Sequence, residues 1–402
     1  MLDRAGCDAK TEHLTGGTLN IVFKLVLMKH KIRLELVSRR VRQHAQSFTA
    51  WSLIKSVVIT DERDKFCRIN NIRVPLHVLS PAVRCIISRC WNIRLIDLRL
   101  SSNPIAHSAV AEAVVCNGVG SLRKLTHLSL DGQNSFEVSS SILALINVLK
   151  RQLRYLHFFG IHNSSAIDAL ARLWELVGEC VNLRTLIYFG MRYTIASASE
   201  AQLREMITTA LLNKPIRRLC LTTECIKTDE MVQIISSLAN DHSLYSLEVS
   251  SYLVTLPDLF HKLSPVHWTG VRHFRYSHTG VLDGASPAWS GVLSLPLLFP
   301  RLKSLMLLIC WFQLSVHQVV DMILTYLSHL NARGSRTRSS TALKLTLFSL
   351  AMHARDRTEV LRSLADDYNC ELEMLADDEH HCRIRCGRSG NGCIELFYLC
   401  DR

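Results

Sequence analysis

The fold of this chain is decided by one stretch, Leu95-Ile96-Asp97-Leu98-Arg99-Leu100-Ser101-Ser102-Asn103-Pro104-Ile105. It follows the pattern Leu-x-x-Leu-x-Leu-x-x-Asn, with Asn103 at the Asn position and Ile105 at the apolar position that comes after it. Apolar anchors alternating with polar residues over so short a run indicate a strand with one buried face. A single match means little in a chain this rich in leucine, so its recurrence decides the matter.

The same pattern recurs along the chain with a period near 30 residues. Further copies start at residues 125, 153, 183, 216, 244, 271, 302 and 342, at intervals of 27 to 40 residues. Nine copies in register are hard to obtain by chance. This motif with this period is typical of leucine-rich repeats.

The segments between the copies have apolar residues at the i, i+3, i+4, i+7 spacing of an amphipathic helix. We expect helices over 82–90, 106–115, 140–149, 165–176, 200–212, 228–238 and 316–330. One strand and one helix per period predict an α/β leucine-rich-repeat solenoid, a horseshoe lined by parallel strands. We expect residues 61–402 to form this domain, with a degenerate first repeat at 61–94 and a C-terminal cap at 357–402.

Stacked repeats bury the leucine anchors, and the residues between the anchors point out of the concave sheet because strand side chains alternate. Solenoids bind partners on such surfaces, and a mixture of Arg, His and Tyr can hold an acidic or phosphorylated segment by charge-assisted hydrogen bonds. The alternative is that these are solvated strand residues without a partner. The candidate partner-binding residues are Asp97, Arg99, His127, Tyr155, His157, Arg218, Glu248, His273 and Arg275.

Residues 14–60 carry no copy of the repeat and predict a small helical module. Val22-Phe23-x-x-Val26 is followed by a second segment with apolar residues at Ile32, Leu34, Leu36 and Val37, then by three arginines and later by Trp51. In this register the segment resembles an F-box, whose pattern runs from Leu-Pro through Ile-Phe-x-x-Leu to a second helix and a late Trp. The chain departs from that pattern at Thr15, where the family has Pro, and at His30, where it has Asp. An F-box followed directly by leucine-rich repeats is a known arrangement in that family.

This resemblance implies a substrate-recognition subunit of an SCF-type (cullin–RING) ubiquitin ligase, which does no chemistry of its own. Its partners would be the SCF adaptor subunit with the cullin complex, and an unidentified target protein. The residues that the resemblance places against the adaptor are Leu14, Leu19, Phe23, Val26, Ile32, Leu34 and Val37. Two alternatives stay open: the segment is a plain helical cap on the first repeat, or the chain is a non-enzymatic scaffold or inhibitor without a ligase link.

The remaining features disfavour other classes of function. The start of the chain has no apolar secretory segment. The most apolar stretch is interrupted by Pro296, Pro300, Arg301 and Lys303. The 14 scattered cysteines indicate reduced thiols in the cytoplasm or nucleus. We expect no membrane span, no enzyme motif, no cofactor and no metal. The loosely spaced pair Cys382-x-x-x-Cys386 is explained better as one strand of a hairpin with 394–399 than as part of a zinc site. The net charge of +12 permits nucleic acid, but the basic 331–341 loop lacks interleaved aromatic residues.

Overall fold

The structure is a computed structural model, and it describes residues 51–278 with short gaps and several later segments. The gaps fall at 52, 63–64, 71, 101–103, 137, 163–166, 192–199, 213, 224–226, 239–242, 252–255 and 264–267. The later segments are 298–299, 301–302, 304–309, 343–349, 371–374, 381–386 and 392–398. The chain divides into two compact units, Met1–Leu183 and Arg184–Arg402, which are called unit 1 and unit 2 below.

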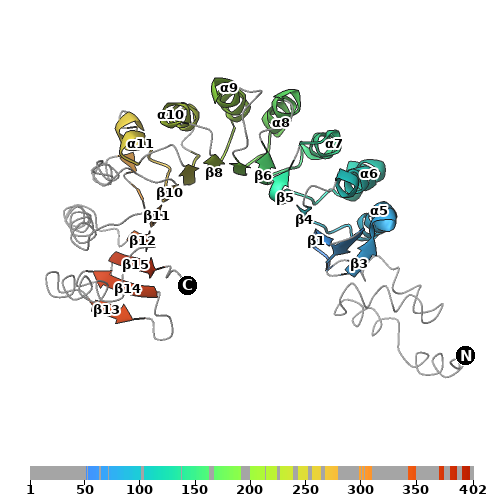
Figure 1. Cartoon of the computed structure of the whole chain (residues 1–402), viewed down its shortest axis with the longest axis horizontal. Helices are drawn as coiled ribbons and strands as arrows, with labels where there is room; N and C mark the ends of the chain where they lie inside the picture. Colours follow the sequence, from blue (N-terminus) through green and yellow to red (C-terminus); the bar gives the residue numbers. More distant parts are fainter. Residues whose placement is uncertain are drawn as a thin grey trace, which may run out of the picture. The chain divides into compact units, whose positions relative to one another are not determined.

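Unit 1 is a sheet with helices on one side (Figure 1). Its sheet order is β6-β5-β4-β1-β2-β3, in which β6, β5, β4 and β1 run parallel and β2 and β3 are antiparallel. The strands are β1 (Ser56–Glu62), β2 (Phe66–Ile69), β3 (Ile72–Pro75), β4 (Leu95–Arg99), β5 (His127–Phe136) and β6 (Tyr155–His162). The helices are the 3-10 turn η2 (Leu76–Val78), α5 (Leu79–Arg89), α6 (Pro104–Ser121), α7 (Ser140–Leu149) and α8 (Ile167–Glu179).

The core of unit 1 consists of two rows of apolar side chains that cross the parallel strands. Pairing places Ile96 beside Leu128 and Leu128 beside Leu156, and the second row runs from Leu98 through Leu130 to Phe158. All of these side chains are 2% exposed or less. Each repeat therefore buries its anchors against the next repeat, and the described strands confirm the predicted parallel α/β repeat.

The copy of the repeat at residue 95 is predicted two residues too late. Leu95 pairs with His127, an outward position, and the buried anchors of this repeat are Ile93 and Ile96 together with Leu98. Ile105, predicted as an anchor, is 63% exposed. The physical reason is that isoleucine fills the anchor positions here, so that the outward Leu95 imitates an anchor.

The first repeat also begins earlier than the predicted boundary at residue 61. Strand β1 pairs in parallel with β4, so that Val57 lies beside Ile96 and Ile59 beside Leu98. Ile54-x-x-Val57-x-Ile59 is therefore a copy of the repeat, with β-branched residues in place of leucine. The outer edge of β1 is covered by the antiparallel hairpin of β2 and β3, which the sequence reasoning did not expect.

The helices of unit 1 follow the expected segments closely. Helix α7 has the predicted bounds 140–149 and begins where the Ser139 hydroxyl accepts a hydrogen bond from the Ile142 amide at 3.4 Å. Ion pairs join successive repeats on this side, with Arg84 of α5 2.6 Å from Glu112 of α6 and Lys150 paired with Glu179. These pairs are solvent-exposed, so packing of the apolar helix faces supplies most of the stability.

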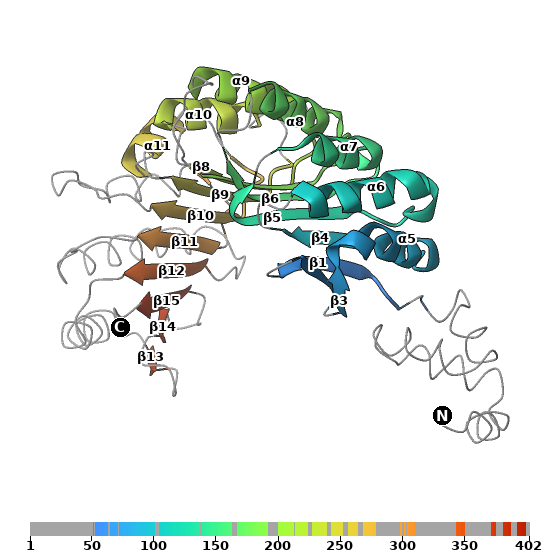
Figure 2. The same cartoon turned by 45° about the vertical axis from the view of Figure 1, so that its right-hand side comes forward.

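Unit 2 repeats the same plan, with sheet order β13-β14-β15-β12-β11-β10-β9-β8-β7. Figure 2 shows its strands side by side, with the helices on one side. The strands are β7 (Thr185–Met191), β8 (Arg218–Thr223), β9 (Ser246–Ser251), β10 (His273–His278), β11 (Ser304–Ile309), β12 (Leu343–Ser349), β13 (Glu371–Met374), β14 (His381–Cys386) and β15 (Gly392–Tyr398). The helices are α9 (Glu200–Leu211), α10 (Thr228–Ser237) and α11 (Leu256–Leu263).

The C-terminal strands extend the repeat beyond the last copy predicted from the motif. Strand β15 pairs in parallel with β12, placing Ile394 beside Leu345 and Leu396 beside Leu347. It is therefore one more copy of the repeat. Strands β14 and β15 form the predicted antiparallel hairpin, with Cys386 opposite Gly392. Three predicted segments lie outside the described residues: 14–50, the helix at 316–330 and the loop at 331–341.

Candidate partner-binding surface

The sheet face of unit 1 that lies opposite its helices carries a row of ring side chains. His127 on β5 stacks on Tyr155 of β6, with ring centroids 5.2 Å apart. Along β6, edge-to-face contacts continue from Tyr155 to His157 at 6.5 Å and from His157 to Phe159 at 6.3 Å. These four residues are called the ring ladder. Flat rings held against one another lose little conformational freedom on binding, which suits a contact surface for another protein.

Polar groups border the ring ladder on the neighbouring strands. Ser129 Oγ lies 3.1 Å from His157 Nδ1, and the Arg99 Nε donates to Asp97 Oδ2 at 2.9 Å. The other oxygen of Asp97 is buried and has no hydrogen-bond partner among the described residues. A buried carboxylate oxygen of this kind needs a donor. The surface therefore places aromatic contact area beside the Asp97–Arg99 ion pair.

Burial sets the charge of the two histidines in the ring ladder. Desolvation lowers the pKa of His157, although the carboxylates of Asp131 and Asp97 act in the opposite direction. Desolvation also lowers the pKa of His127, and the nearby charge of Arg154 adds to that effect. Both rings are therefore neutral at physiological pH, and the ladder behaves as an apolar surface with hydrogen-bonding edges.

We predict that this surface makes the folding stability depend on pH. The pKa of His157 is lower in the folded chain than its unfolded value of about 6.5, so protons bind preferentially to the unfolded chain in this range. Stability is therefore complete above that value and falls as the pH drops through it. Urea unfolding at pH 7.5 and pH 5.5 should show this loss, and His157→Gln should reduce it. An identical loss in the variant would contradict the assignment.

The corresponding face of unit 2 is organised by two polar pairs. Arg275 Nε lies 3.2 Å from Glu248 Oε1, and His273 Nε2 lies 2.8 Å from the Tyr245 hydroxyl. Cys220 lies beside Glu248 on the neighbouring strand and is buried. Desolvation, together with the nearby Glu248, raises the pKa of its thiol to about 12. The thiol is therefore not a nucleophile at neutral pH. This face therefore presents polar and aromatic groups.

The structure brings most of the predicted partner-binding residues into local groups. Asp97 lies with Arg99, His127 with Tyr155 and His157, and Glu248 with Arg275, whereas Arg218 is an exposed cation. Sequence reasoning missed Phe159 and Tyr245. Phe159 continues the alternation of β6 by two more residues, a signal that was present in the sequence, whereas Tyr245 depends on the inter-strand register. The predicted adaptor-binding residues lie outside the described part.

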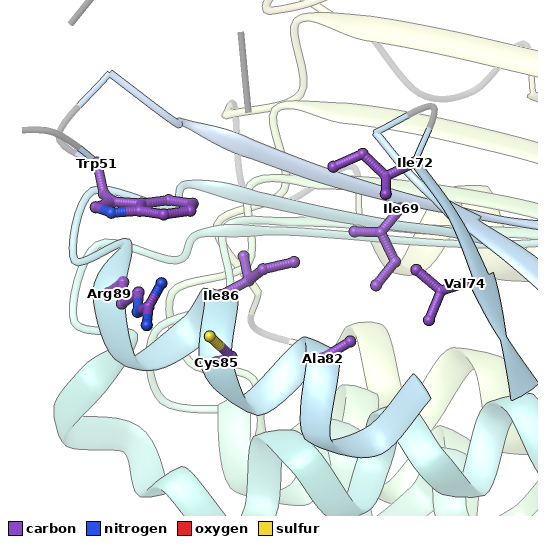
Figure 3. A pocket seen from close by; sticks show the side chains of 8 residues that line it. All are labelled: Trp51, Ile69, Ile72, Val74, Ala82, Cys85, Ile86 and Arg89. Atoms are coloured by element: carbon purple, nitrogen blue, oxygen red, sulfur yellow. The ribbon is translucent and has the colours of Figure 1, made fainter. Parts of the chain in front are cut away.

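A pocket of about 200 Å³ lies between α5 and the β2–β3 hairpin (Figure 3). Ile69 and Val74 face Ile86 across it, and Trp51 and Arg89 stand at one end. The Arg89 guanidinium carbon lies 5.5 Å from the centre of the Trp51 ring. The other lining side chains are apolar or, in Cys85, a thiol. The pocket therefore has the character of a hydrophobic contact site.

Among the residues that the structure describes, no group of three or more His, Cys, Asp or Glu side chains could hold a metal ion. None of the helices within the described ranges has the length and apolar character needed to cross a membrane. Six cysteines carry free thiols: Cys67, Cys85, Cys90, Cys116, Cys180 and Cys220.

Comparisons with known proteins give the chain no family. No protein-family model matches it, and no curated protein matches it either. Among solved structures, the chain is similar to an internalin, InlF, from Listeria monocytogenes. The TM-score is 0.29 and the sequence identity is 15%, over 73% of this chain and 68% of the internalin. The strand register and the buried anchors of this chain establish its repeat.

Proposed function

We propose that this chain is the substrate-recognition subunit of an SCF-type ubiquitin ligase in the cytoplasm or nucleus. Residues 14–50 contact the SCF adaptor, and the sheet faces hold the target protein. The chain itself performs no chemistry. The observation that carries the target-binding part is the ring ladder, a row of His, Tyr and Phe side chains on a sheet face that the helices of unit 1 leave open.

The covered edge of the first repeat supports a separate role for residues 14–50. A helical cap at the N-terminus would serve to shield the edge of the first repeat. In this chain, however, the β2–β3 hairpin already pairs with the outer edge of β1, and Trp51 is 1% exposed. The repeat domain contains its own cap, and this favours adaptor docking over capping for the segment that resembles an F-box.

Co-purification with the SCF adaptor tests the ligase link. The full chain should capture the adaptor, and Phe23→Asp or Ile32→Asp should abolish this capture, because a charge is costly at a buried apolar contact. A matched control is Ile105→Asp, since Ile105 is 63% exposed on α6 and should retain the adaptor. Absence of the adaptor from the wild-type complex, with the repeats folded, would leave the scaffold or inhibitor as the function.

A further inference from the structure

One edge of the sheet in unit 1 carries a continuous set of exposed cations. It is the edge at which the parallel strands begin. Every parallel strand contributes at least one cation there. We call this set the basic rim, and it consists of Lys55, Arg94, Arg123, Lys124, Arg151 and Arg154, all of which are exposed.

Backbone hydrogen bonds fix the spacing of the basic rim. The Lys55 carbonyl accepts from the Arg94 amide at 2.7 Å, and the Arg94 carbonyl accepts from the Thr126 amide at 3.0 Å. The Thr126 carbonyl in turn accepts from the Arg154 amide at 2.8 Å. Successive residues of this row are therefore one strand apart, about 4.8 Å. In one repeat the residue of this row is Thr126, which is uncharged. There the positive charge is carried by Arg123 and Lys124.

None of the cations of the basic rim has a carboxylate partner among the described residues, in contrast to several arginines elsewhere in unit 1. Arg68, Arg84, Arg99 and Arg172 each form an ion pair. By contrast, Lys124 contacts the Trp91 ring at 3.9 Å and the Asn92 side chain at 3.2 Å, both of which are neutral. A row of uncompensated cations at fixed spacing attracts negative charge.

The pattern of charge along the strands indicates what kind of anion fits. The basic rim lies at the strand starts, and the ring ladder follows. Beside the ladder, Asp97 on β4 lies level with His157, and Asp131 on β5 lies level with Phe159. A nucleic acid places a phosphate at every nucleotide, and those phosphates would be repelled where the strands carry Asp97 and Asp131. A polypeptide can present acidic residues to the rim and neutral or donor groups to the carboxylates.

The geometry points to a target protein whose contact segment carries clustered acidic residues that dock on the basic rim beside the ring ladder. This inference rests on the proposed function, because it names the chemistry of the partner that the sheet face holds. Unit 2 has exposed arginines at the same repeat position, Arg184 and Arg217, so the feature belongs to the repeat rather than to one loop. Arginine at these positions suits carboxylates, which it binds through two parallel hydrogen bonds.

Panning a library of random 12-residue peptides against the full chain tests this inference. Enriched peptides should be rich in Asp and Glu. When they are synthesised with a fluorescent label, Arg94→Gln/Arg154→Gln should weaken their binding about tenfold or more. The matched control Arg84→Gln/Arg172→Gln removes the same charge from exposed helix positions and should leave binding within about twofold. Raising the salt concentration should weaken binding to the wild type.

Four results would overturn the inference. Enriched peptides without excess acid, or equal losses in the two double variants, would exclude the basic rim while leaving protein binding by the sheet face intact. Rim-dependent binding of a 12-nucleotide oligothymidylate that is tighter than that of the peptides would identify a polyanion in place of an acidic protein segment. A panning experiment that enriches no peptide would count against the inference and against target binding together, whereas capture of the adaptor tests the ligase link separately.

Discussion

Replacing Ile96 by Ala is expected to lower the free energy of unfolding by about 2–5 kcal/mol. Ile96 is 2% exposed and lies in the buried row between Val57 and Leu128, so the truncation leaves a cavity shared by three repeats. Because each repeat contacts only its neighbours, the loss is felt first in the adjoining strands. Chemical denaturation followed by circular dichroism measures the effect.

Leu95→Ala is the matched control, because it removes the same number of side-chain carbons one residue away. Leu95 occupies an outward, partly exposed position beside His127, so its loss should cost less than about 1 kcal/mol. The motif places Leu95 at an anchor and Ile96 between anchors, so the pair of variants distinguishes the two registers. A larger loss at Leu95 than at Ile96 would restore the register taken from the motif alone.

This pair also shows what the sequence could and could not predict about the fold. The period is visible because leucine fills most anchors, and most of the predicted helices follow from apolar stripes of normal length. The register of one repeat is not visible where isoleucine replaces leucine, as at Ile93 and Ile96. The first and last copies are not recognised from the motif for similar reasons. In the first copy, Val57 and Ile59 are β-branched residues in place of leucine. The copy around Ile394 has Asn391 in place of its first anchor.

For the candidate site, the sequence predicts which side chains leave the sheet face, but not how deeply they are buried or which residues they contact. Alternation along a strand states which side chains leave the sheet, and a shift of two residues preserves that direction, so Asp97 and Arg99 remain on the outward face. Burial of an outward residue depends on its neighbours in the adjoining strands. Asp97 is only 7% exposed for this reason, and Cys220 is likewise covered. The basic rim depends on the same lateral register, which no single repeat contains.

The second large effect is expected at Asn70, which closes the edge of the first repeat. Its backbone amide donates to the Val58 carbonyl at 2.9 Å. Its side chain accepts from the Val58 amide at 2.7 Å and donates to the Ser56 carbonyl at 3.0 Å. The amide side chain thus replaces a missing strand residue where the hairpin turns away. Asn70 does this with φ at 47°, a left-handed conformation that asparagine tolerates better than most residues.

Asn70→Ala should therefore destabilise the chain by about 3 kcal/mol, of which two hydrogen bonds account for about 1 kcal/mol each and the left-handed backbone for at least about 1 kcal/mol. Asn70→Gly separates these causes, because glycine relieves the backbone but not the lost hydrogen bonds, and it should recover about 1 kcal/mol. Urea unfolding of the three proteins measures both differences. If Ala and Gly are equally destabilising, the backbone contribution is absent. If neither variant differs from the wild type in its free energy of unfolding, the hairpin does not stabilise β1, and the repeat domain has no cap of its own.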